Sequence, residues 1–495
     1  MRQTTASEAS LPTAKLRRVG WIDMQALLVA MAAGAALFAG LCWLTGEIEP
    51  LASIQTDALL AILITLNLAP PLAELAYKRF DPFDAKHLFF AYFFLILTFH
   101  SFCAVTFGLV VKPGLAATMA DASVLIRALS AITLGLAAFV AGCYLPLGSL
   151  IARTLPRIAA RVSVNRIRIV ALGGLALGGL AFYRLMASSG GIASFLANLG
   201  TWRTVGVLNG VGYLTFPITG VLPVAILLLL LYTLPGRRQR LTWRALRVIA
   251  LALASLVPIF ILGFRVSLVP VILFFLAAWH YVRRFIRINQ MMGLGATLVV
   301  FLTLFSLVRG GQWTVGDTKA ALLFRVPGLD IVERVVWRTG LGEPHHGFRP
   351  MFVESATIMV PRAIWPAKPA PTGLEFCDVF FYDFFIGRGD PIDGIKSGVS
   401  PTFIGEMLWV GGIYAVMLGA LVLGVAARTA VVWRQRGRGH RLHVFVYAIF
   451  MANFAIFAEA PQLALNDFAM FSVMTLGLVL FLTIRLRWSR TTILS

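Results

Sequence analysis

Long apolar runs alternate with short polar segments along almost the whole chain. Runs of about 18 or more apolar residues have the length that an α-helix needs to cross a bilayer. The first run, 21–44, is too long for the core of a signal peptide and others follow it, so we interpret it as a retained span. The pattern therefore predicts an all-α fold, a polytopic integral membrane helical bundle with about 12 transmembrane helices.

The apolar runs also fix where the predicted spans lie. We expect them at 21–44, 54–76, 87–110, 124–148, 167–187, 209–234, 248–264, 266–282, 290–308, 402–427, 443–459 and 465–484. The seventh and eighth are short and only Arg265 separates them, which predicts a tight hairpin or one broken element. The spans use most of the chain, so we interpret residues 1–495 as a single membrane domain.

Composition supports the membrane assignment. Hydrophobic residues make up 59% of the chain and charged residues 13%, with a mean hydropathy of +0.84. Soluble globular proteins carry about 25% charged residues, so a single water-soluble core is excluded. The net charge of +21 does not indicate a nucleic-acid partner, because the basic residues form short clusters between the apolar runs. We expect membrane lipids, and no nucleic acid, among the partners.

The distribution of Lys and Arg predicts the orientation. With the N-terminus inside, 28 of the 43 basic residues fall in inner segments, while ten lie in one long outer loop and five elsewhere outside. Short cytoplasmic segments are enriched in Lys and Arg, whereas long loops cross the membrane regardless of charge. The N- and C-termini are therefore predicted to be cytoplasmic, with the chain in the inner membrane of a bacterium.

The long loop, 309–401, lies between the ninth and tenth spans and is predicted to be periplasmic. It holds ten basic and ten acidic residues, together with many Trp, Pro and Gly residues, which predicts a folded segment. Within it, 331–338 has apolar residues at helical spacing, with Arg334 and Arg338 four residues apart. This pattern predicts a short amphipathic helix among the expected short helices of the loop.

The chain lacks the motifs of common cofactors and metals. The cysteines are Cys42, Cys103, Cys143 and Cys377, and they show no CxxC spacing. There is no Walker A motif, no GxSxG and no His or Cys cluster with the spacing of metal ligands. Charged residues are sparse in the middle of the spans, which argues against an ion-coupled transporter. We expect neither a cofactor nor a metal.

Two outer-side arginines lie outside the long loop, where the charge rule disfavours them. Arg203 precedes the sixth span and Arg265 lies at the turn of the short hairpin. A half-buried arginine there needs an anionic partner. A guanidinium offers a planar fork of donors that matches phosphate oxygens, so both are candidates for binding a diphosphate. A structural ion pair, or contact with lipid phosphate, is the alternative.

A second candidate group lies in the stretch GEPHHGFRPMFVESATIMVPRAIWPAKPAPTG. Its polar and aromatic members are His345, His346, Arg349, Glu354, Arg362, Trp365 and Lys368. Glu354 or one of the two histidines is a candidate general base, because an attacking hydroxyl must lose a proton. Adjacent residues of an extended chain point to opposite faces, which disfavours a metal held by His345 and His346. A solvated polar loop is the alternative for any one of these residues.

Several acidic residues complete the set of candidates. Glu406 lies in the first two turns of the tenth span, where a carboxylate is costly unless it is paired or faces water. It either takes part in the site or pairs structurally with an outer arginine. Glu47 and Glu49 form an ExE in the first outer loop, of interest in some membrane glycosyltransferases but otherwise two solvated acids. Asp81 and Asp84 are interpreted as turn residues of an inner loop.

The run PRAIWPAKPAPTG, followed by SPTFIGEMLWVGGIYAVMLGALVLG, resembles the late outer loop and following span of Wzy-type O-antigen and exopolysaccharide repeat-unit polymerases. The matching positions are Arg362, Trp365, Pro366, Lys368, Pro369, Gly405, Glu406, Gly411 and Gly412. Two earlier stretches, GGIASFLANLGTWR and GFRVSLVPVILFF, are similar to an outer loop and a span start of that family, with Arg203 and Arg265 at its arginine positions.

The resemblance implies a glycosyltransferase that joins undecaprenyl-diphosphate-linked oligosaccharide repeat units on the periplasmic face and releases the carrier diphosphate. On this interpretation Arg203, Arg265, Arg349 and Arg362 bind the diphosphates, with Lys368 as a further cation. Glu354, His345 or His346 takes the proton of the acceptor hydroxyl, and Glu406 orients an arginine. The energy comes from the substrate, so no nucleotide is needed. A chain-length regulator and a flippase are the expected protein partners.

Two other functions stay open. Another lipid-linked glycosyltransferase, such as an O-antigen ligase or a polyprenyl-phosphate-sugar enzyme, has the same physical needs, and a monophosphate-sugar enzyme gives more weight to Glu47 and Glu49. A non-enzymatic flippase or exporter of lipid-linked oligosaccharide is the second alternative. The one-sided charge and the lack of a visible internal repeat favour the enzyme.

Overall fold

A computed structural model gives the arrangement of most of the chain. It describes residues 11–45, 52–107, 121–158, 162–197, 214–236, 239–262, 265–297, 328–342, 345–357, 360, 364–365, 375–376, 379–380, 401–437, 440–459 and 461–483. Every element assigned in these residues is a helix. Long apolar sequences adopt helices in a bilayer because each backbone N–H and C=O then finds a partner within the segment.

The helices follow one another along the described chain without strands between them. In order they are α1 (Leu11–Thr45), α2 (Ala52–Ala76), α3 (Ala85–Phe93), η1 (Phe94–Thr98), α4 (Phe99–Phe107), α6 (Ala122–Tyr144), α7 (Leu147–Thr154), α8 (Val164–Ser188), α9 (Ile192–Ala197), η3 (Pro217–Val221), α11 (Leu222–Thr233), α12 (Trp243–Ala254), α13 (Leu256–Ile261), α14 (Arg265–Ala278), η4 (Trp279–Arg283), α17 (Leu329–Gly340), α18 (Phe348–Thr357), α20 (Phe403–Arg436), α21 (Arg441–Ile456) and α22 (Pro461–Thr483). The three η elements are π-helical turns within longer helices.

Eight of the described helices are long and apolar enough to cross a membrane. They are Asp23–Leu44, Ser53–Ala76, Ala85–Thr106, Ala122–Tyr144, Val164–Ser188, Trp243–Ile261, Phe403–Arg436 and Ala464–Thr483. Three shorter apolar helices, Pro217–Thr233, Leu268–Arg283 and Arg441–Ile456, coincide with three more predicted spans. The ninth predicted span, 290–308, is described only as far as residue 297. The predicted all-helical, membrane-type bundle is confirmed in these residues.

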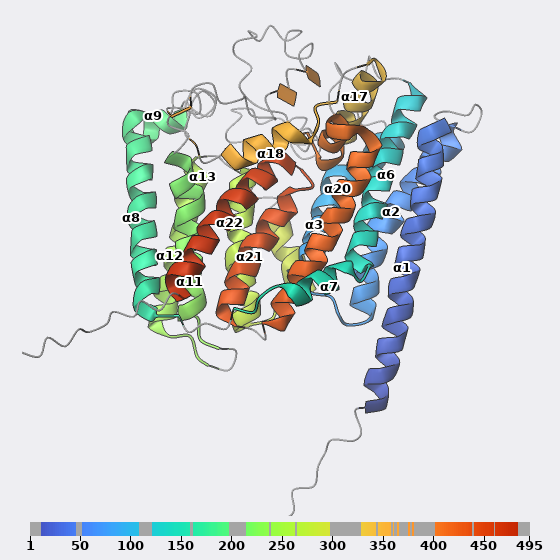
Figure 1. Ribbon diagram of the computed structural model, residues 1–495. Coiled ribbons are helices and arrows are strands. Elements are labelled where there is room, and N and C mark those ends of the chain that lie inside the picture. The colour runs from blue at the N-terminus through green and yellow to red at the C-terminus, as the bar shows by residue number, and fades with distance from the viewer. Residues whose placement is uncertain are drawn as a thin grey trace, which may run out of the picture.

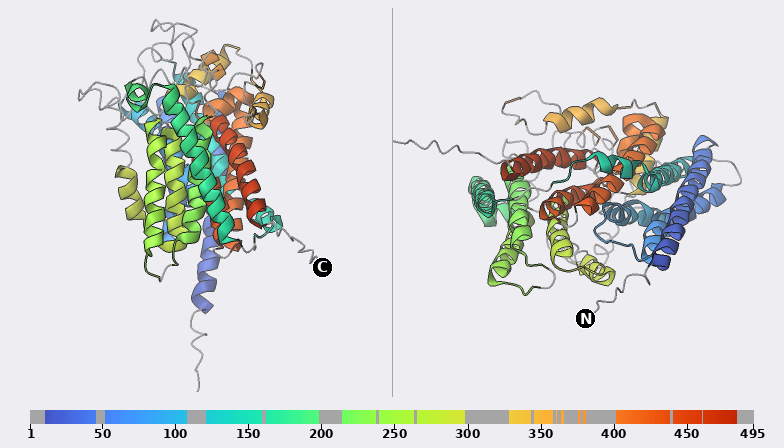
Figure 2. Two further views of the ribbon diagram at one scale, coloured as in Figure 1. Left: turned by 90° about the vertical axis from the view of Figure 1, so that its left-hand side faces the viewer. Right: turned by 60° about the horizontal axis from the view of Figure 1, so that its bottom comes forward.

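Helix α6 lies between α20 and α1 in the right-hand part of Figure 1 and packs against α1, α2 and α20. Its contact with α20 depends on two glycines that face each other. A Cβ added to Gly142 would lie 2.4 Å from the Leu421 carbonyl oxygen, and one added to Gly424 would lie 2.3 Å from that of Phe139. Helices in membranes associate through such close backbone approach, because lipid removes the hydrophobic drive to pack. Helices α1 and α8 stand at opposite edges of the bundle (Figures 1 and 2).

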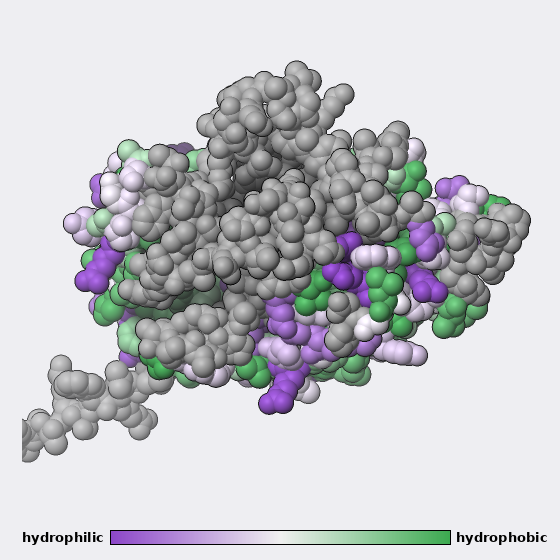
Figure 3. All heavy atoms as spheres, turned by 90° about the horizontal axis from the view of Figure 1, so that it is seen from above, coloured by the Kyte–Doolittle hydropathy of each residue, from purple (hydrophilic) through white to green (hydrophobic). Residues whose placement is uncertain are grey.

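The two ends of the bundle differ in character. We call the end that carries α17 and α18 the loop end, at the top of Figure 1, and the opposite end, which carries α7, the basic end. Arginines at the basic end bind backbone carbonyls of neighbouring segments: Arg283 donates to Gly236 O at 2.8 Å and Arg441 to Leu234 O at 2.9 Å. At the loop end hydrophilic and hydrophobic side chains reach the surface together (Figure 3).

Candidate functional site

Helix α20 breaks near the loop end. Gly411 (φ −167°, ψ 30°) and Gly412 (φ 66°, ψ −157°) leave the helical region, so that a short first segment is joined to a long second one at a kink. The positive φ of Gly412 is a conformation that residues with a side chain rarely adopt. A break in the helix releases backbone carbonyls that must find other partners in an apolar bundle.

Residues 345–347 supply those partners. The backbone N–H of His346 donates to the Trp409 carbonyl at 2.9 Å, and the N–H of Gly347 donates to the Val410 carbonyl at 2.9 Å. The segment of the long loop that carries the two histidines is therefore fixed to the glycine pair of α20. This pairing explains why the glycine pair and the histidines belong together, although more than sixty residues separate them in the sequence.

The two histidines point to different surroundings, as expected for neighbours on an extended segment. The His346 ring stacks on Trp409 with centroids 4.2 Å apart, and its Nε2 lies 3.1 Å from Glu375 Oε2. His345 is exposed, and its ring lies close to the Cα of Gly412. Among the described residues, neither histidine belongs to a group of possible metal ligands. The two histidines are linked only as neighbours along the backbone.

A buried polar network joins α18 to the start of α22. Gln462 donates through Nε2 to Ser355 Oγ at 3.0 Å, to Asn466 Oδ1 at 2.8 Å and to the Met351 carbonyl at 3.1 Å. Asn466 donates in turn to Glu354 Oε1 at 2.7 Å and accepts from Ser355 Oγ at 2.8 Å. Polar side chains with this density are costly in an apolar bundle unless they bind one another or a ligand.

Glu406 extends this network to α20. Its side chain is fully buried in the first turn of the helix, and Oε2 accepts the N–H of Gln462 at 3.3 Å. The other oxygen, Oε1, is buried without a hydrogen-bond partner, as is Oε1 of Gln462. Neither atom has a partner in the described part of the chain, in which Glu354 is close enough to act on Glu406 through its charge. Two acceptor atoms are thus available to a hydrogen-bond donor or a cation.

The network can perform acid–base chemistry on a hydroxyl. Glu354 is half-buried on α18 and keeps its carboxylate oriented through Asn466. An oriented carboxylate at a polar patch can accept the proton of a hydroxyl that attacks an electrophile. The signal for Gln462 and Asn466 is readable in the sequence, because two amides four residues apart lie on one face of an apolar helix. They were not among the residues that the sequence singled out.

Helix α17 forms the neighbouring part of the loop end and confirms the amphipathic helix predicted for 331–338. Its start is held by His100, whose Nδ1 accepts the Leu329 N–H at 3.2 Å. Arg334 is buried, and its Nε donates to the Phe380 carbonyl at 2.8 Å. Burial, together with the charge of Asp330, raises the pKa of Glu333 to about 8. A carboxyl group with that pKa can exchange a proton near neutral pH.

Of the other predicted site residues, the structure describes Arg349 and the backbone of Arg265. Arg349 is exposed on α18, one turn and a residue before Glu354. Arg265 is the first residue of α14, near the loop end, and only its backbone is described. The remaining predicted residues, Arg203, Arg362, Lys368, Glu47 and Glu49, lie outside the described residues.

A second cluster of charges lies at the basic end and was underestimated from the sequence. Asp81 and Asp84 do lie in a turn, but they also belong to buried ion networks. Asp81 contacts Arg434 Nη2 at 3.3 Å and His280 Nε2 at 3.3 Å, and it accepts from Tyr281 Oη at 3.0 Å. Burial opposes its ionisation, but these partners outweigh that effect and lower the pKa of Asp81. The turn thereby links η4 and α20.

Glu74, Asp84 and His87 have ligand atoms within 4.8 Å of one another, a spacing that could hold a metal ion. The ammonium group of Lys86, however, contacts Glu74 and lies 3.5 Å from Asp84 Oδ2. His87 Nδ1 lies 2.6 Å from the Asp81 carbonyl oxygen, and its Nε2 lies 3.1 Å from Glu74 Oε2. The Lys86 ammonium group already neutralises these carboxylates, and the residues do not call for a metal.

Comparison of the chain with protein-family models, with curated proteins and with solved structures gives no match. The interpretation of the site therefore depends on its residues and geometry.

Proposed function

We propose that the chain is a membrane glycosyltransferase that polymerises polyprenyl-diphosphate-linked oligosaccharide repeat units at its loop end. The observation that carries the proposal is the buried polar network of Gln462, Asn466, Ser355, Glu354 and Glu406. It lies among apolar helices and leaves the Oε1 atoms of Glu406 and Gln462 without a partner among the described residues. Sugars present many hydroxyl donors, and oxygen acceptors of this kind are suited to bind them.

The proposed reaction joins the growing glycan to a new repeat unit. A hydroxyl oxygen of the new unit attacks the anomeric carbon of the growing chain, and its proton passes to Glu354. The bond from that carbon to the diphosphate oxygen breaks, and the carrier diphosphate leaves with the electron pair. Arginines stabilise the charge that develops on the leaving oxygens, and Arg203, Arg265, Arg349 and Arg362 are the candidates from the sequence, with Lys368 beside them.

We also propose an orientation and a full set of spans. The eight spanning helices, the three shorter apolar helices and the predicted span at 290–308 together make twelve crossings. Twelve crossings place both termini on one side, which the charge rule assigns to the cytoplasm of a bacterium, and the loop end then faces the periplasm. Reporter fusions at Ser495 and within 309–327 test this orientation, and a periplasmic signal at Ser495 would contradict it.

The activity is tested by glycan profiling of cells whose only copy carries Arg265→Ala or Glu354→Gln, with expression matched to the unaltered protein. We expect single lipid-linked repeats without polymer for both variants. Arg127→Ala is the matched control, because Arg127 is an exposed arginine near the loop end of α6, and it should make full-length polymer. Full-length polymer from a complete deletion would end the proposal.

The accumulated intermediate separates the alternatives. Loss of a polymerase leaves single repeat units on the carrier, whereas loss of a ligase leaves long polymer attached to the carrier. Loss of a flippase leaves repeat units that a probe confined to the periplasmic side does not detect. Polymer on the carrier after Glu354→Gln would therefore favour the ligase over the polymerase.

A further inference from the structure

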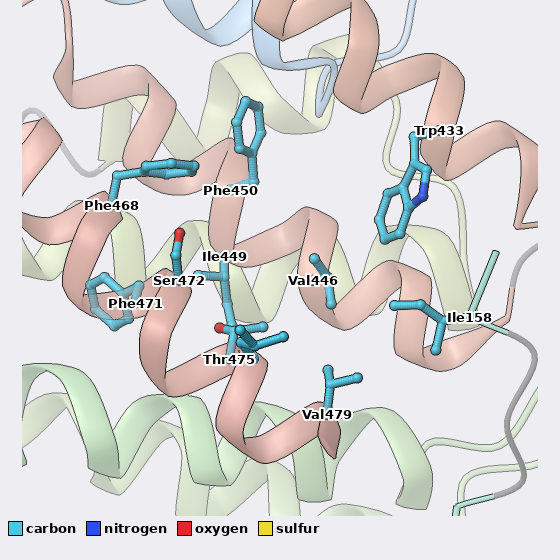
Figure 4. A pocket seen from close by; sticks show the side chains of 11 residues that line it. Ile158, Trp433, Val446, Ile449, Phe450, Phe468, Phe471, Ser472, Thr475 and Val479 are labelled. Atoms are coloured by element: carbon cyan, nitrogen blue, oxygen red, sulfur yellow. The ribbon is translucent and has the colours of Figure 1, made fainter. Parts of the chain in front are cut away.

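An apolar groove opens between α21 and α22 in the half of the bundle next to the basic end. Its cavity measures about 280 Å³ and is lined mainly by aliphatic and aromatic side chains, from Phe450 and Phe468 at one end to Trp433 and Ile158 at the other (Figure 4). Leu476 on its rim is 60% exposed, so the groove opens to the surroundings of the bundle. Within a spanning segment those surroundings are lipid acyl chains.

The end of the groove at Trp433 is fixed by hydrogen bonds to a short polar segment. Trp433 Nε1 donates to the Pro156 carbonyl at 2.9 Å, and the Ile158 N–H donates to His443 Nε2 at 2.9 Å. The rings of Trp433 and His443 lie with their centroids 4.2 Å apart and their planes tilted by 33°. Arg157, which lies between the two bonded positions of this segment, is exposed and makes no ion pair with the described residues.

The charges around this end have one sign. Arg157 and Arg436 come from two different elements, His440 comes from the turn before α21, and all three act electrostatically on His443. No carboxylate of the described chain acts on His443 in the same way. An arginine fixed to a carbonyl, as Arg436 is to that of Ala152, keeps its charge at a set place. A basic cluster at the end of an apolar groove is complementary to a molecule with an anionic head and an apolar tail.

We infer that this groove binds an acidic phospholipid of the leaflet at the basic end. Its acyl chain lies between α21 and α22, and its phosphate faces Arg157, Arg436 and His440. Basic pockets between transmembrane helices on the cytoplasmic side bind anionic headgroups, and the cytoplasmic leaflet carries the anionic lipids that supply them. The hydroxyl of Thr475 lines the groove, buried and without a partner in the described chain, and is available to a glycerol or ester oxygen of the lipid.

The test uses the full chain in detergent, with phosphatidylglycerol or phosphatidylcholine of identical acyl chains as probes. Native mass spectrometry counts the lipid retained, and thermal unfolding reports the stabilisation that binding produces. We expect phosphatidylglycerol to be retained and to raise the unfolding midpoint, with neither effect from phosphatidylcholine or from inorganic phosphate alone. No glycan substrate is present, so the outcome does not depend on the proposed glycosyltransferase activity.

Two variants locate the lipid, each with a matched control. Arg157→Gln should weaken retention about fivefold, the factor that corresponds to about 1 kcal/mol for one basic side chain at an anionic surface. Arg244→Gln removes an equally exposed arginine on α12 and should leave retention unchanged. Ser472→Phe fills the groove and should abolish retention, whereas Val473→Phe, at a neighbouring position that is 59% exposed, should not.

Several results would overturn the inference. Equal retention of the two phospholipids would show that the charge is irrelevant, and equal stabilisation by inorganic phosphate would show that the apolar groove is irrelevant. Unchanged retention in both Arg157→Gln and Ser472→Phe would place the lipid elsewhere. Binding of a polyprenyl phosphate without any binding of phosphatidylglycerol would assign the groove to a carrier lipid instead.

Discussion

The two ends of the bundle both bury carboxylates, but they satisfy them differently. At the basic end, Glu74 faces Lys86 and His87, and Asp81 faces Arg434. At the loop end, the only hydrogen bond to Glu406 from the described residues is the N–H of Gln462, and one carboxylate oxygen has none. The basic end thus pairs its carboxylates with cations, whereas the loop end leaves acceptor oxygen atoms without a partner among the described residues.

This difference separates a structural cluster from a candidate site. A buried ion pair is stable when geometry and hydrogen bonds offset the cost of removing both charges from water. A buried carboxylate without a cation carries that cost alone, and such groups concentrate at functional sites. The basic end therefore holds helices together, whereas the loop end is where we expect a ligand. Five variants, described below, compare the two ends.

The largest effect is expected from breaking the basic-end cluster. Glu74→Gln removes the carboxylate that contacts Lys86 and leaves Asp84 as the nearest described counter-charge, and loss of one partner of a buried pair costs about 3–5 kcal/mol. We expect a loss of that size in the free energy of unfolding, measured by denaturation in mixed micelles. Asp57→Asn, at an exposed position of the same helix, should change it by less than about 0.5 kcal/mol. A loss below about 1 kcal/mol for Glu74→Gln would show that the cluster is not structural.

The corresponding change at the loop end should affect activity rather than folding. Glu406→Gln keeps the shape of the side chain and replaces a buried carboxyl group that has no cationic partner among the described residues. Loss of a buried hydrogen-bond partner costs about 1–3 kcal/mol, so we expect polymer formation to fall by about fivefold or more. The unfolding midpoint should stay the same or rise. A fall in stability as large as that of Glu74→Gln would remove the distinction between the two ends.

The kink in α20 gives a smaller, local effect. Gly412→Ala places a side chain at a φ of 66°, in a backbone region that costs about 1–3 kcal/mol for residues other than glycine. We expect a loss of that size together with reduced polymer, since the kink holds residues 345–347. Gly34→Ala on α1 is the control: an added Cβ meets nothing within 4 Å, and helix propensity favours alanine. Equal behaviour of the two variants would show that the kink bears no strain.

The smallest effect concerns pH. The pKa of Glu333 is raised to about 8, so between about pH 4.5 and 8 the folded chain holds a proton that the unfolded chain has released. This contribution to stability is present at low pH and is lost as the pH rises through 8. Glu333→Gln should unfold at a higher temperature than the unaltered protein at pH 9 and at a similar one at pH 5.

The basic end should respond to pH in the opposite direction. The pKa of Asp81 is lowered, so its contribution is present above its ordinary value near 4 and is lost as the pH falls below it. Asp81→Asn should therefore lower the unfolding temperature at pH 7 and matter less at pH 3. A lower unfolding temperature of Glu333→Gln at pH 9, or an equal effect of Asp81→Asn at pH 3 and pH 7, would contradict the two assignments.

Much of the fold could be predicted from the sequence, but less of the site. The start of α20 and the helix at 331–338 were expected from apolar periodicity, and both exist. The sequence also singled out Glu354, Glu406 and the glycine pair. It missed Gln462 and Asn466, because the partners that give these amides a role, Ser355 and Glu354 on α18, lie 107 and 112 residues away in the chain. Asp81 was interpreted as a turn residue, since its ion partners lie far away in the chain.

The sequence by itself determined the membrane-type helices. A run of about 20 apolar residues can satisfy its backbone in lipid only as a helix, so length and composition suffice. Only the tertiary structure decided which polar groups meet. Gln462 and Ser355 are 107 residues apart and Tyr447 and Ala85 are 362 apart, yet each pair is joined by a hydrogen bond. Such pairings follow from how helices distant in the sequence pack against each other, which local patterns do not encode.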